Sequence, residues 1–498
     1  MSVRVTSAAE SSALDAAAIA GGIPSRALMR VAAANAATVI AARFGAELSR
    51  GVQVYAGAGN NGGDGWSVAA ALAATGVPVT VREVAEARTP DALAEREAAL
   101  ARVSRGTVDA PIVIDALLGT GSRGAPEGAL ADAVRAIGAA RNRGAYVVAL
   151  DIPTGLDATS GSRAEPSVAA DLTITFGTVK RGALVRRAAC GEIVVVDIGL
   201  PHVPGPHPTL VDAAYVRVHV PEIAPDAHKG TRASVAIIAG ARTMGGAAID
   251  AAEGALRSGA GLVKVITDSA NIAAVHARLP EALTASIDTA LDAIDGWGDV
   301  VVIGPGLGHD ANARALVHAV LEQWRGPIVL DADALNVYDG ELDLLASVIA
   351  DRPAVITPHP AEFARLVRRG VPDVLAERFD AGAKLARDLR ATVLLKGTPT
   401  VISAPDGARL VSATGTAALA TGGSGDVLSG MVGTLLAQRL TPLDAAACAA
   451  WVHGRAAELT PGVRGTRLQD VVEHLAAAWR LDDAASRYPV LATLPALG

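Results

Sequence analysis

Short runs of β-branched and aliphatic residues alternate along this chain with longer Ala- and Leu-rich segments. Strand-like runs lie at 52–55, 77–84, 112–114, 146–150, 172–176 and 193–196, and again at 235–239, 262–266, 300–303, 328–330, 354–356 and 392–395. Helix-like segments separate several of these runs, which is typical of βαβ units and a parallel sheet. The pattern therefore predicts an α/β protein.

A proline-rich stretch interrupts the alternation once. Four prolines fall between residues 201 and 208, and the chain from there to Pro225 shows no strong periodicity. The alternation then resumes. We predict two doubly wound α/β domains, an N-terminal Rossmann-like three-layer domain at 1–215 and a C-terminal domain at 220–498.

The composition limits the classes of function. Of the 498 residues, 51% are hydrophobic but only 3% are aromatic, so the cores must be built from Ala, Val, Leu and Ile. The formal net charge is −7 and no dense block of Lys or Arg occurs, which argues against a nucleic-acid partner. We expect small-molecule partners.

The cysteines and the N-terminal residues exclude further classes of protein. Cys190 and Cys448 are far apart, which excludes a disulfide framework and a thiolate zinc site. Glu10 and Asp15 interrupt the N-terminal segment, which is therefore no secretory signal. The motifs of P-loop NTPases, zincins and α/β-hydrolases do not occur. We expect a cytoplasmic homo-oligomer with no membrane partner.

Polar and glycine-rich loops follow the predicted strands. In doubly wound sheets, ligands bind beyond the carboxyl ends of the strands, so these loops are where a site is expected. They span 57–65, 115–125, 151–157, 304–308, 331–336, 357–362 and 396–400.

The segment 420–430 carries the strongest chemical signal, because Asp426 directly follows a run of glycines that opens a predicted helix. Free N–H groups at a helix N-terminus stabilise an oxyanion, and an adjacent carboxylate can accept a proton from a hydroxyl or water. A tight turn with Asp426 as a capping residue is the alternative.

The loop 57–65 contains a formal G-x-G-x-x-G, with Glu83 beyond Gly62, so a dinucleotide site must be considered. Asp64 would oppose a pyrophosphate at the helix N-terminus. The amide oxygens of Asn60 and Asn61 suit a hard cation, which favours a cation site over a glycine-rich turn. Asp115 and Asp151 add two strand-end acids, and Arg123 could hold phosphate.

These N-terminal motifs, above all G-x-G-N-N-G-G-D-G, resemble the NAD(P)H-hydrate epimerase family, the YjeF N-terminal domain, over residues 10–215. The resemblance implies a K+ ion among Asn61, Asp115 and Thr154, and Asp151 as the acid/base that contacts substrate. It assigns hydrate binding to Asn60, Asn61, Gly62, Gly63 and Asp64, and to Gly119, Thr120, Gly121, Ser122, Arg123, Gly124 and Ala125.

In the second half, a Lys followed by Gly and hydroxyls at 396–400 can clamp a nucleotide phosphate. His359 lies between two prolines, where a structural and a catalytic role are both open.

This half resembles the ADP- or ATP-dependent NAD(P)H-hydrate dehydratase family, the YjeF C-terminal domain with a ribokinase-like fold, over residues 225–490. The resemblance implies hydrate contacts at Ala247, Gly306, His359 and Asp426. It implies adenine-nucleotide binding at Lys396, Gly397, Thr398, Pro399, Thr400 and Gly425.

Together the two resemblances imply repair of NADHX and NADPHX, the hydrated nicotinamide nucleotides. The first domain would interconvert the R and S hydrates, and the second would dehydrate the S form at the expense of ADP or ATP with Mg2+. In the mechanism we predict, Asp426 is the base while the ring hydroxyl is phosphorylated. The alternatives are a ribokinase-type small-molecule kinase with an N-terminal regulatory domain, and a non-enzymatic nucleotide-sensing role for that domain.

Overall fold

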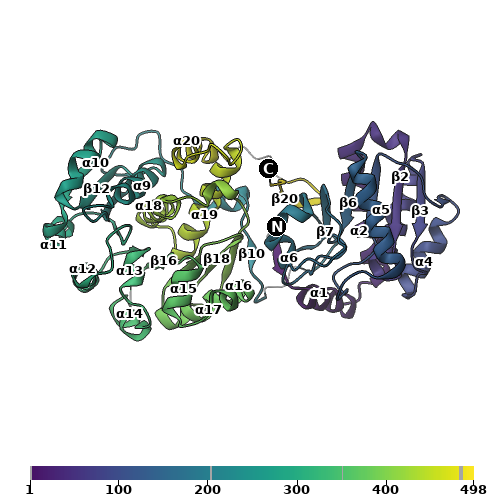
Figure 1. The fold of residues 1–498 in the computed structure, drawn as a ribbon, viewed down its shortest axis with the longest axis horizontal. Coiled ribbons are helices and arrows are strands. Elements are labelled where there is room, and N and C mark those ends of the chain that lie inside the picture. Colours follow the sequence, from purple (N-terminus) through teal and green to yellow (C-terminus); the bar gives the residue numbers. More distant parts are fainter. Residues whose placement is uncertain (1–2, 202–204, 350–351, 482–485, 498) are drawn as a thin grey trace. The chain divides into compact units, whose positions relative to one another are not determined.

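The computed structural model describes residues 3–201, 205–349, 352–481 and 486–497 of the chain. They form two compact units (Figure 1): Met1–Thr209 with Ala485–Leu497, and Leu210–Ala484. Residues 202–204 of the predicted linker lie outside the described residues.

The first unit is built on a largely parallel sheet in the order β20-β9-β7-β6-β5-β2-β3-β4. Its strands are β20 (Val490–Leu494), β9 (Glu192–Val196), β7 (Leu172–Phe176), β6 (Tyr146–Leu150), β5 (Ile112–Ala116), β2 (Val52–Ala56), β3 (Val79–Glu83) and β4 (Ser104–Arg105). The helices are α1 (Ala8–Ala20), α2 (Ser25–Phe44), α3 (Asn60–Ala74), α4 (Pro90–Ala99), α5 (Gly128–Asn142), α6 (Arg181–Val185) and α7 (Arg187–Cys190). Outside this sheet, β1 (Arg4–Thr6) lies parallel to β8 (Thr178–Lys180) and pairs with β10 (Thr209–Leu210).

Alternate residues of the central strands face opposite layers. Val148 and Leu150 of β6 belong to the cluster that contains α2 and α3, whereas Val147 and Ala149 pack with α5. Because both faces are covered, β2 and β5 are buried along their whole length, as expected for parallel strands. The predicted three-layer arrangement is confirmed.

Helix α2 is long and apolar enough to cross a membrane by length and composition. Half of its apolar window is buried within the protein, and side chains such as Ile40 and Phe44 lie in the core beside the sheet. In this structure α2 is a core helix of the first unit.

The last strand departs from the predicted boundaries, which assigned 220–498 to one domain. Strand β20 lies antiparallel to β9 and closes that edge of the first unit's sheet, where its yellow ribbon stands among dark strands (Figure 1). The Asp197 amide donates to the Pro489 carbonyl at 2.8 Å, and Leu494 is buried. The segment 486–497 therefore belongs to the first unit, because an open strand edge can pair with any extended segment that reaches it.

We expect Leu494→Ala to lower the free energy of unfolding of the first unit by about 2–4 kcal/mol, as for other buried leucines. Thr493 is the matched control, because it is exposed on the same strand and its replacement by Ala should change stability by less than about 0.5 kcal/mol. Denaturant unfolding of the full chain measures both. Equal effects of the two substitutions would show that β20 is not held on the sheet.

The second unit has a nine-stranded sheet in the order β13-β12-β11-β14-β15-β16-β17-β18-β19 within its described residues. Its strands are β11 (Ser234–Ile238), β12 (Leu262–Thr267), β13 (Leu283–Ser286), β14 (Val300–Ile303), β15 (Ile328–Leu330), β16 (Ala354–Ile356), β17 (Thr392–Leu395), β18 (Thr400–Ser403) and β19 (Arg409–Ser412). The helices of eight or more residues are α9 (Gly245–Arg257), α12 (Ala311–Gln323), α14 (Leu342–Ile349), α17 (Arg378–Leu389), α18 (Ser424–Ala437), α19 (Pro442–Leu459) and α20 (Leu468–Ala478). The shorter helices include α8 (Ala213–His219), α10 (Ile272–Arg278), α11 (Ala290–Ile294), α13 (Asp333–Asn336), α15 (Pro360–Leu366) and α16 (Val371–Ala376).

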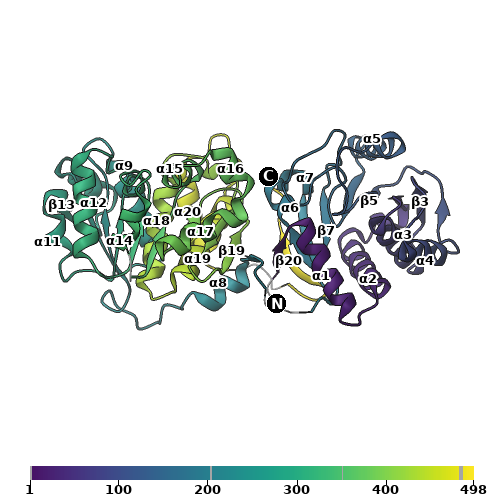
Figure 2. The same ribbon diagram turned by 90° about the horizontal axis from the view of Figure 1, so that it is seen from below.

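The twelve predicted strand runs all correspond to strands, which confirms the doubly wound α/β class for both units (Figure 2). The helices of the second unit cover both faces of its sheet. Val235 and Ile237 of β11 face the cluster with α9, α18 and α19, whereas Ala236 and Ile238 face the cluster with α12.

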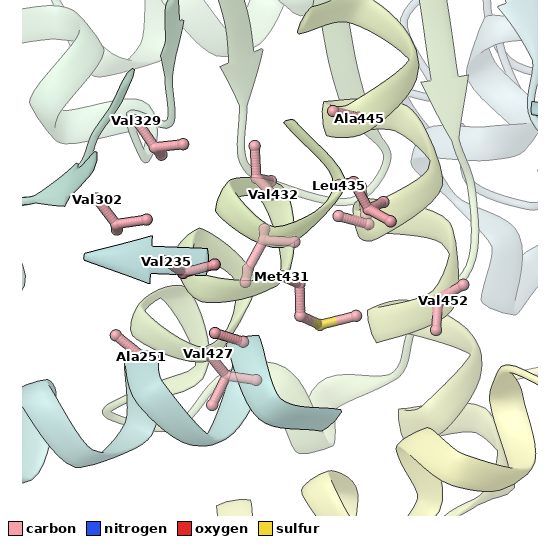
Figure 3. Packing of buried hydrophobic residues seen from close by; sticks show 14 of the residues in the cluster. Val235, Ala251, Val302, Val329, Val427, Met431, Val432, Leu435, Ala445 and Val452 are labelled. Atoms are coloured by element: carbon pink, nitrogen blue, oxygen red, sulfur yellow. The ribbon is translucent and has the colours of Figure 1, made fainter. Parts of the chain in front are cut away.

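Helices α9 and α18 pack closely because glycines stand at their contact. A Cβ at Gly254 would lie 2.1 Å from the Val427 carbonyl oxygen, and one at Gly430 would lie 1.9 Å from that of Ala251. Val427 of α18 lies beside α9, and the Met431 side chain extends toward Val452 of α19 within the same buried cluster (Figure 3). Any larger residue at these glycines would force the helices apart.

Each sheet reverses its strand order once. The first unit does so between β2 and β5, and the second between β11 and β14. Such points leave a crevice at the carboxyl ends of the strands where loops from both sides meet. The predicted site loops follow these strands and their neighbours.

Candidate active sites

In the first unit, the loops after β2, β5 and β6 meet around a buried carboxylate. Thr154 donates its backbone N–H (2.8 Å) and its hydroxyl (2.7 Å) to the two oxygens of Asp115. Asn61 is buried in the first turn of α3, and the Gly119 backbone passes over it: a Cβ there would lie 3.1 Å from the Asn61 Cβ. The predicted cation residues thus lie on adjoining loops.

These residues fit a cation. Both the Oδ1 and the Nδ2 of Asn61 are buried without a hydrogen-bond partner, although buried amide oxygens are normally satisfied. Burial raises the pKa of Asp115 to about 6, and the hydrogen bonds from Thr154 oppose that shift. An orphaned oxygen beside a buried carboxylate is a donor set that suits K+.

Beside this group, Asp151 forms an ion pair with Lys180, whose side chain is almost fully buried. Lys180 also donates to Thr175 Oγ1 at 3.0 Å, and the Asp151 backbone has a φ of 65°, an uncommon value for a residue with a side chain. The surrounding structure must hold this conformation, which is common at functional sites.

Two further carboxyls face the Asp151–Lys180 pair. Burial raises the pKa of Asp64 well above its usual value, and the negative charges of Asp151 and Asp15 raise it further. Burial also raises the pKa of Asp15, which comes from α1. A raised pKa favours the neutral form of Asp64, which weakens the objection to an acid at the start of α3.

The remaining residues predicted to bind the hydrate frame this group. At Gly62 a Cβ would lie 1.9 Å from the Gly57 carbonyl oxygen, so this position requires glycine, and at Gly63 one would lie 2.9 Å from the Met29 side chain, which would have to move. Asn60 is exposed at the start of α3. The other loop residues, Thr120, Gly121, Ser122, Arg123, Gly124 and Ala125, are wholly or partly exposed.

In the second unit, the loops after β11 and β14 are joined by hydrogen bonds. The Ala241 amide donates to the Gly306 carbonyl at 2.6 Å, and a Cβ at Gly306 would lie 2.9 Å from that of Ala247. Gly306 has a φ of 60°, which glycine adopts without strain. The structure thus brings together Ala247 and Gly306, as predicted.

Lys396 lies at the centre of the second site. Its ammonium donates to Asp331 Oδ1 at 2.8 Å and lies 3.9 Å from Glu362 Oε2. Burial alone lowers the pKa of Lys396, but the charges of Asp331 and Glu362 outweigh this effect and raise it. A Cβ at Gly425 would lie 3.1 Å from the Lys396 nitrogen, so this lysine stands at the start of α18.

Asp426 lies in the first turn of α18, after Gly423, whose φ is 85°. Burial raises the pKa of Asp426 to about 8, the charge of Asp331 adds to the shift and that of Lys396 opposes it. The first N–H groups of the helix lack intrahelical partners. The loop therefore places the Asp426 carboxyl group and the free amides of the helix N-terminus together.

His359 is the N-cap of α15. Its Nδ1 accepts from the amides of Ala361 (3.0 Å) and Glu362 (3.4 Å), which leaves Nε2 to carry the proton. Its imidazole thus has a structural role, and its half-exposed Nε2 lies 3.3 Å from Glu362 Oε1. In the predicted nucleotide loop, Lys396, Gly397, Thr398 and Thr400 are at least partly exposed, whereas Pro399 is buried.

Comparison with known proteins addresses both halves of the chain. The family described as YjeF-related protein N-terminus matches residues 25–182, and NAD(P)H-hydrate dehydratase matches 235–476. The bifunctional NAD(P)H-hydrate repair enzyme Nnr of Escherichia coli (strain K12) is 37% identical over 83% of this chain and 81% of its own length. The chain belongs to the family of bifunctional NAD(P)H-hydrate repair enzymes.

Other members of this repair-enzyme family are similarly close. Nnr of Mycobacterium leprae (strain TN) is 35% identical over 93% of this chain and 96% of its own. A solved structure, the ADP/ATP-dependent NAD(P)H-hydrate dehydratase from Bacillus subtilis co-crystallized with ATP/Mg2+, is 30% identical and covers 54% of this chain and 97% of its own, with a TM-score of 0.49. The two family models and the relatives from Escherichia coli and Mycobacterium leprae confirm the family resemblances given by the motifs.

Several residues at the two sites were not predicted from the sequence. Lys180 and Asp15 had no motif around them, and their roles depend on contacts with distant loops. In the second unit, Asp250 of α9 adds negative charge next to Asp426, and the buried His453 of α19 lies near Lys396. Burial lowers the pKa of His453 to about 4, so it stays neutral.

Proposed function

We propose that the first unit interconverts the R and S hydrates of NADH and NADPH, and that the second dehydrates the S form using ADP or ATP. The observation that carries this proposal is that each unit holds its own buried acid–base group at its own sheet crevice: Asp151 with Lys180, and Asp426 with Lys396. Family membership supports both activities.

In the first site, Asp151 acts as the base and is held by the Lys180 ammonium, while Asp64 supplies the proton. A carboxylate and a carboxyl group of raised pKa can serve as base and acid in one reaction. Asn61, Asp115 and Thr154 hold K+, which would supply a fixed positive charge beside the substrate. The loop at 119–125, with Arg123 exposed, lies open to receive the nucleotide phosphates.

In the second site, Asp426 removes the proton of the ring hydroxyl. The oxygen of that hydroxyl attacks the terminal phosphoryl group of the nucleotide, and the remainder of the nucleotide is the leaving group. The amides at the start of α18 and the Lys396 ammonium stabilise the transferred phosphoryl group. Phosphate then leaves with the C–O bond electrons, and loss of a ring proton restores the reduced nicotinamide. Nucleotide-bound Mg2+ would neutralise phosphate charge, and the unpaired, buried Asp331 Oδ2 is an oxygen suited to it.

The decisive experiment incubates the purified full chain with both NADH hydrates, ADP or ATP, Mg2+ and K+, and separates the epimers and NADH by chromatography. We expect both epimers to be converted fully to NADH. Accumulation of a stable phosphorylated product would favour a small-molecule kinase instead. Disappearance of the R hydrate at only its spontaneous rate would favour a nucleotide-sensing role for the first unit.

We expect Asp115→Ala to reduce epimerisation at least about 100-fold, because it removes the formal negative charge assigned to the K+ shell and the anchor of the Thr154 loop. Dehydration of pure S hydrate should be unchanged. Asp109→Ala, an exposed acid on the same unit, is the control. Epimerisation that survives both Asp115→Ala and replacement of K+ by tetramethylammonium would contradict the ion site.

The pH dependence of dehydration should report Asp426. Its pKa is raised to about 8 and the ionised form is the active base, so kcat/KM should fall about tenfold per pH unit below pH 8 and level off above it. Rates with S hydrate from pH 6 to 9.5 would measure this profile in the free enzyme. A profile that is flat between pH 6 and 8 would exclude Asp426 as the titrating base.

A further inference from the structure

The second unit has a cavity at the place where four of its helices end. It has a volume of about 580 Å3 and is lined by the last residues of α8, α9, α18 and α20 and by the segments that follow them. This volume falls within the range of small-molecule sites. None of the residues assigned above to catalysis or nucleotide binding lines it.

The cavity has a cationic rim. Four arginines line it, Arg217, Arg232, Arg257 and Arg480, against one acid, Glu222. Two of them already donate to backbone carbonyls, Arg217 to Leu481 and Arg232 to Gly259. In the part of the chain that the structure describes, the Arg480 side chain makes no hydrogen bond or ion pair, so all its donors are available.

Arginines near helix C-termini can be explained by the helix dipole alone. That explanation does not cover two other donors in the same wall. The Ser258 hydroxyl is buried without any hydrogen-bond partner, in a residue only 7% exposed, and the Trp479 indole N–H is also buried and unpaired. Buried donors are rarely left unsatisfied, so an acceptor from a ligand would complete both.

Much of the remaining wall is apolar, with side chains of Val220, Ile223 and Leu256 and the ring of Trp479, and Gln438 adds a polar amide. Ile223 is about half exposed, although it lies against Gly259, where a Cβ would be 3.0 Å from its side chain. A flat apolar group could therefore lie on the indole while an anionic group meets the arginines. We propose that this cavity binds a small molecule that joins an oxyanion to a flat apolar body.

This site is separate from the dehydratase site but shares two helices with it. The first turns of helices α9 and α18 carry Ala247 and Asp426, which belong to the dehydratase site. The residues that follow the two helices, Ser258 and Gln438, line the cavity. A helix of 13 residues spans about 20 Å, so a ligand in the cavity does not overlap the nucleotide. Because glycine contacts lock the two helices together, we expect occupancy to stabilise the second unit.

The test is calorimetric titration of 1-naphthyl phosphate into the full chain saturated with ADP and Mg2+. We expect one saturable site per chain with a Kd below about 1 mM, and binding of the neutral 1-naphthol at least about tenfold weaker. A raised melting temperature of the second unit should accompany binding. No saturable binding, equal binding of 1-naphthol, or displacement of the probe by additional ADP would each overturn the proposal.

Variants locate the site. Arg480→Glu should weaken probe binding at least about tenfold, and Ser258→Ala about fivefold, because each removes a donor to the anion. Arg387→Glu, on the exposed face of α17, makes the same charge change away from the cavity and should bind normally. Dehydratase activity of all three variants should equal that of the parent, which checks folding. Unchanged affinity in both cavity variants would overturn the assignment.

Discussion

We expect Asp426→Asn to abolish recovery of NADH from the S hydrate, with a loss in kcat of about 10²–10⁴, as for removal of a positioned general base. The asparagine keeps the shape of the side chain but cannot accept the hydroxyl proton. Nucleotide binding should stay within a few-fold, because Lys396 and the amides at the start of α18 remain. Single-turnover chromatography of S hydrate with ADP and Mg2+ measures the rate.

A matched control is Asp343→Asn, which changes an exposed acid in the first turn of another helix, α14. It should leave dehydration unchanged. Epimerisation should be normal in both variants, because it takes place in the other unit. NADH recovery by Asp426→Asn near the parent rate would show that another group, such as Asp331, accepts the proton.

The second large effect is expected for Asp151→Asn, which should reduce epimerisation about 10²–10⁴-fold while dehydration of S hydrate continues. This variant also leaves the buried Lys180 ammonium without its partner, which costs about 3–5 kcal/mol in comparable proteins. Activity loss alone would therefore mix a chemical and a structural cause.

The double variant Asp151→Asn with Lys180→Met separates the two causes. Replacing the ammonium with an apolar side chain of similar length should recover most of the unfolding free energy but none of the epimerisation. Denaturant unfolding and epimer chromatography on the same samples give both numbers, with Asp132→Asn on the exposed face of α5 as control. Recovery of epimerisation in the double variant would mean that Asp151 only positions the loop.

Family, fold class and most strands could be predicted from the sequence because they depend on local patterns. The runs 112–114 and 300–303, which became β5 and β14, are buried on both faces and are continuous apolar segments. The motif at 57–65 and the glycines before Asp426 could be identified because a loop that approaches a ligand at a helix start needs small residues, and these stand next to one another in the sequence.

Strand β20 and the Asp151–Lys180 pair could be decided only by the tertiary structure. The 486–497 segment carries no signal for its partner, since an antiparallel edge strand is specified by the open edge it meets, here that of β9. Likewise Asp15, Asp151 and Lys180 lie far from Asp64 in sequence, and their effect on the pKa of Asp64 depends on distance and burial. Sequence by itself determined which loops carry chemistry; charge coupling between those loops exists only once the sheets have brought them together.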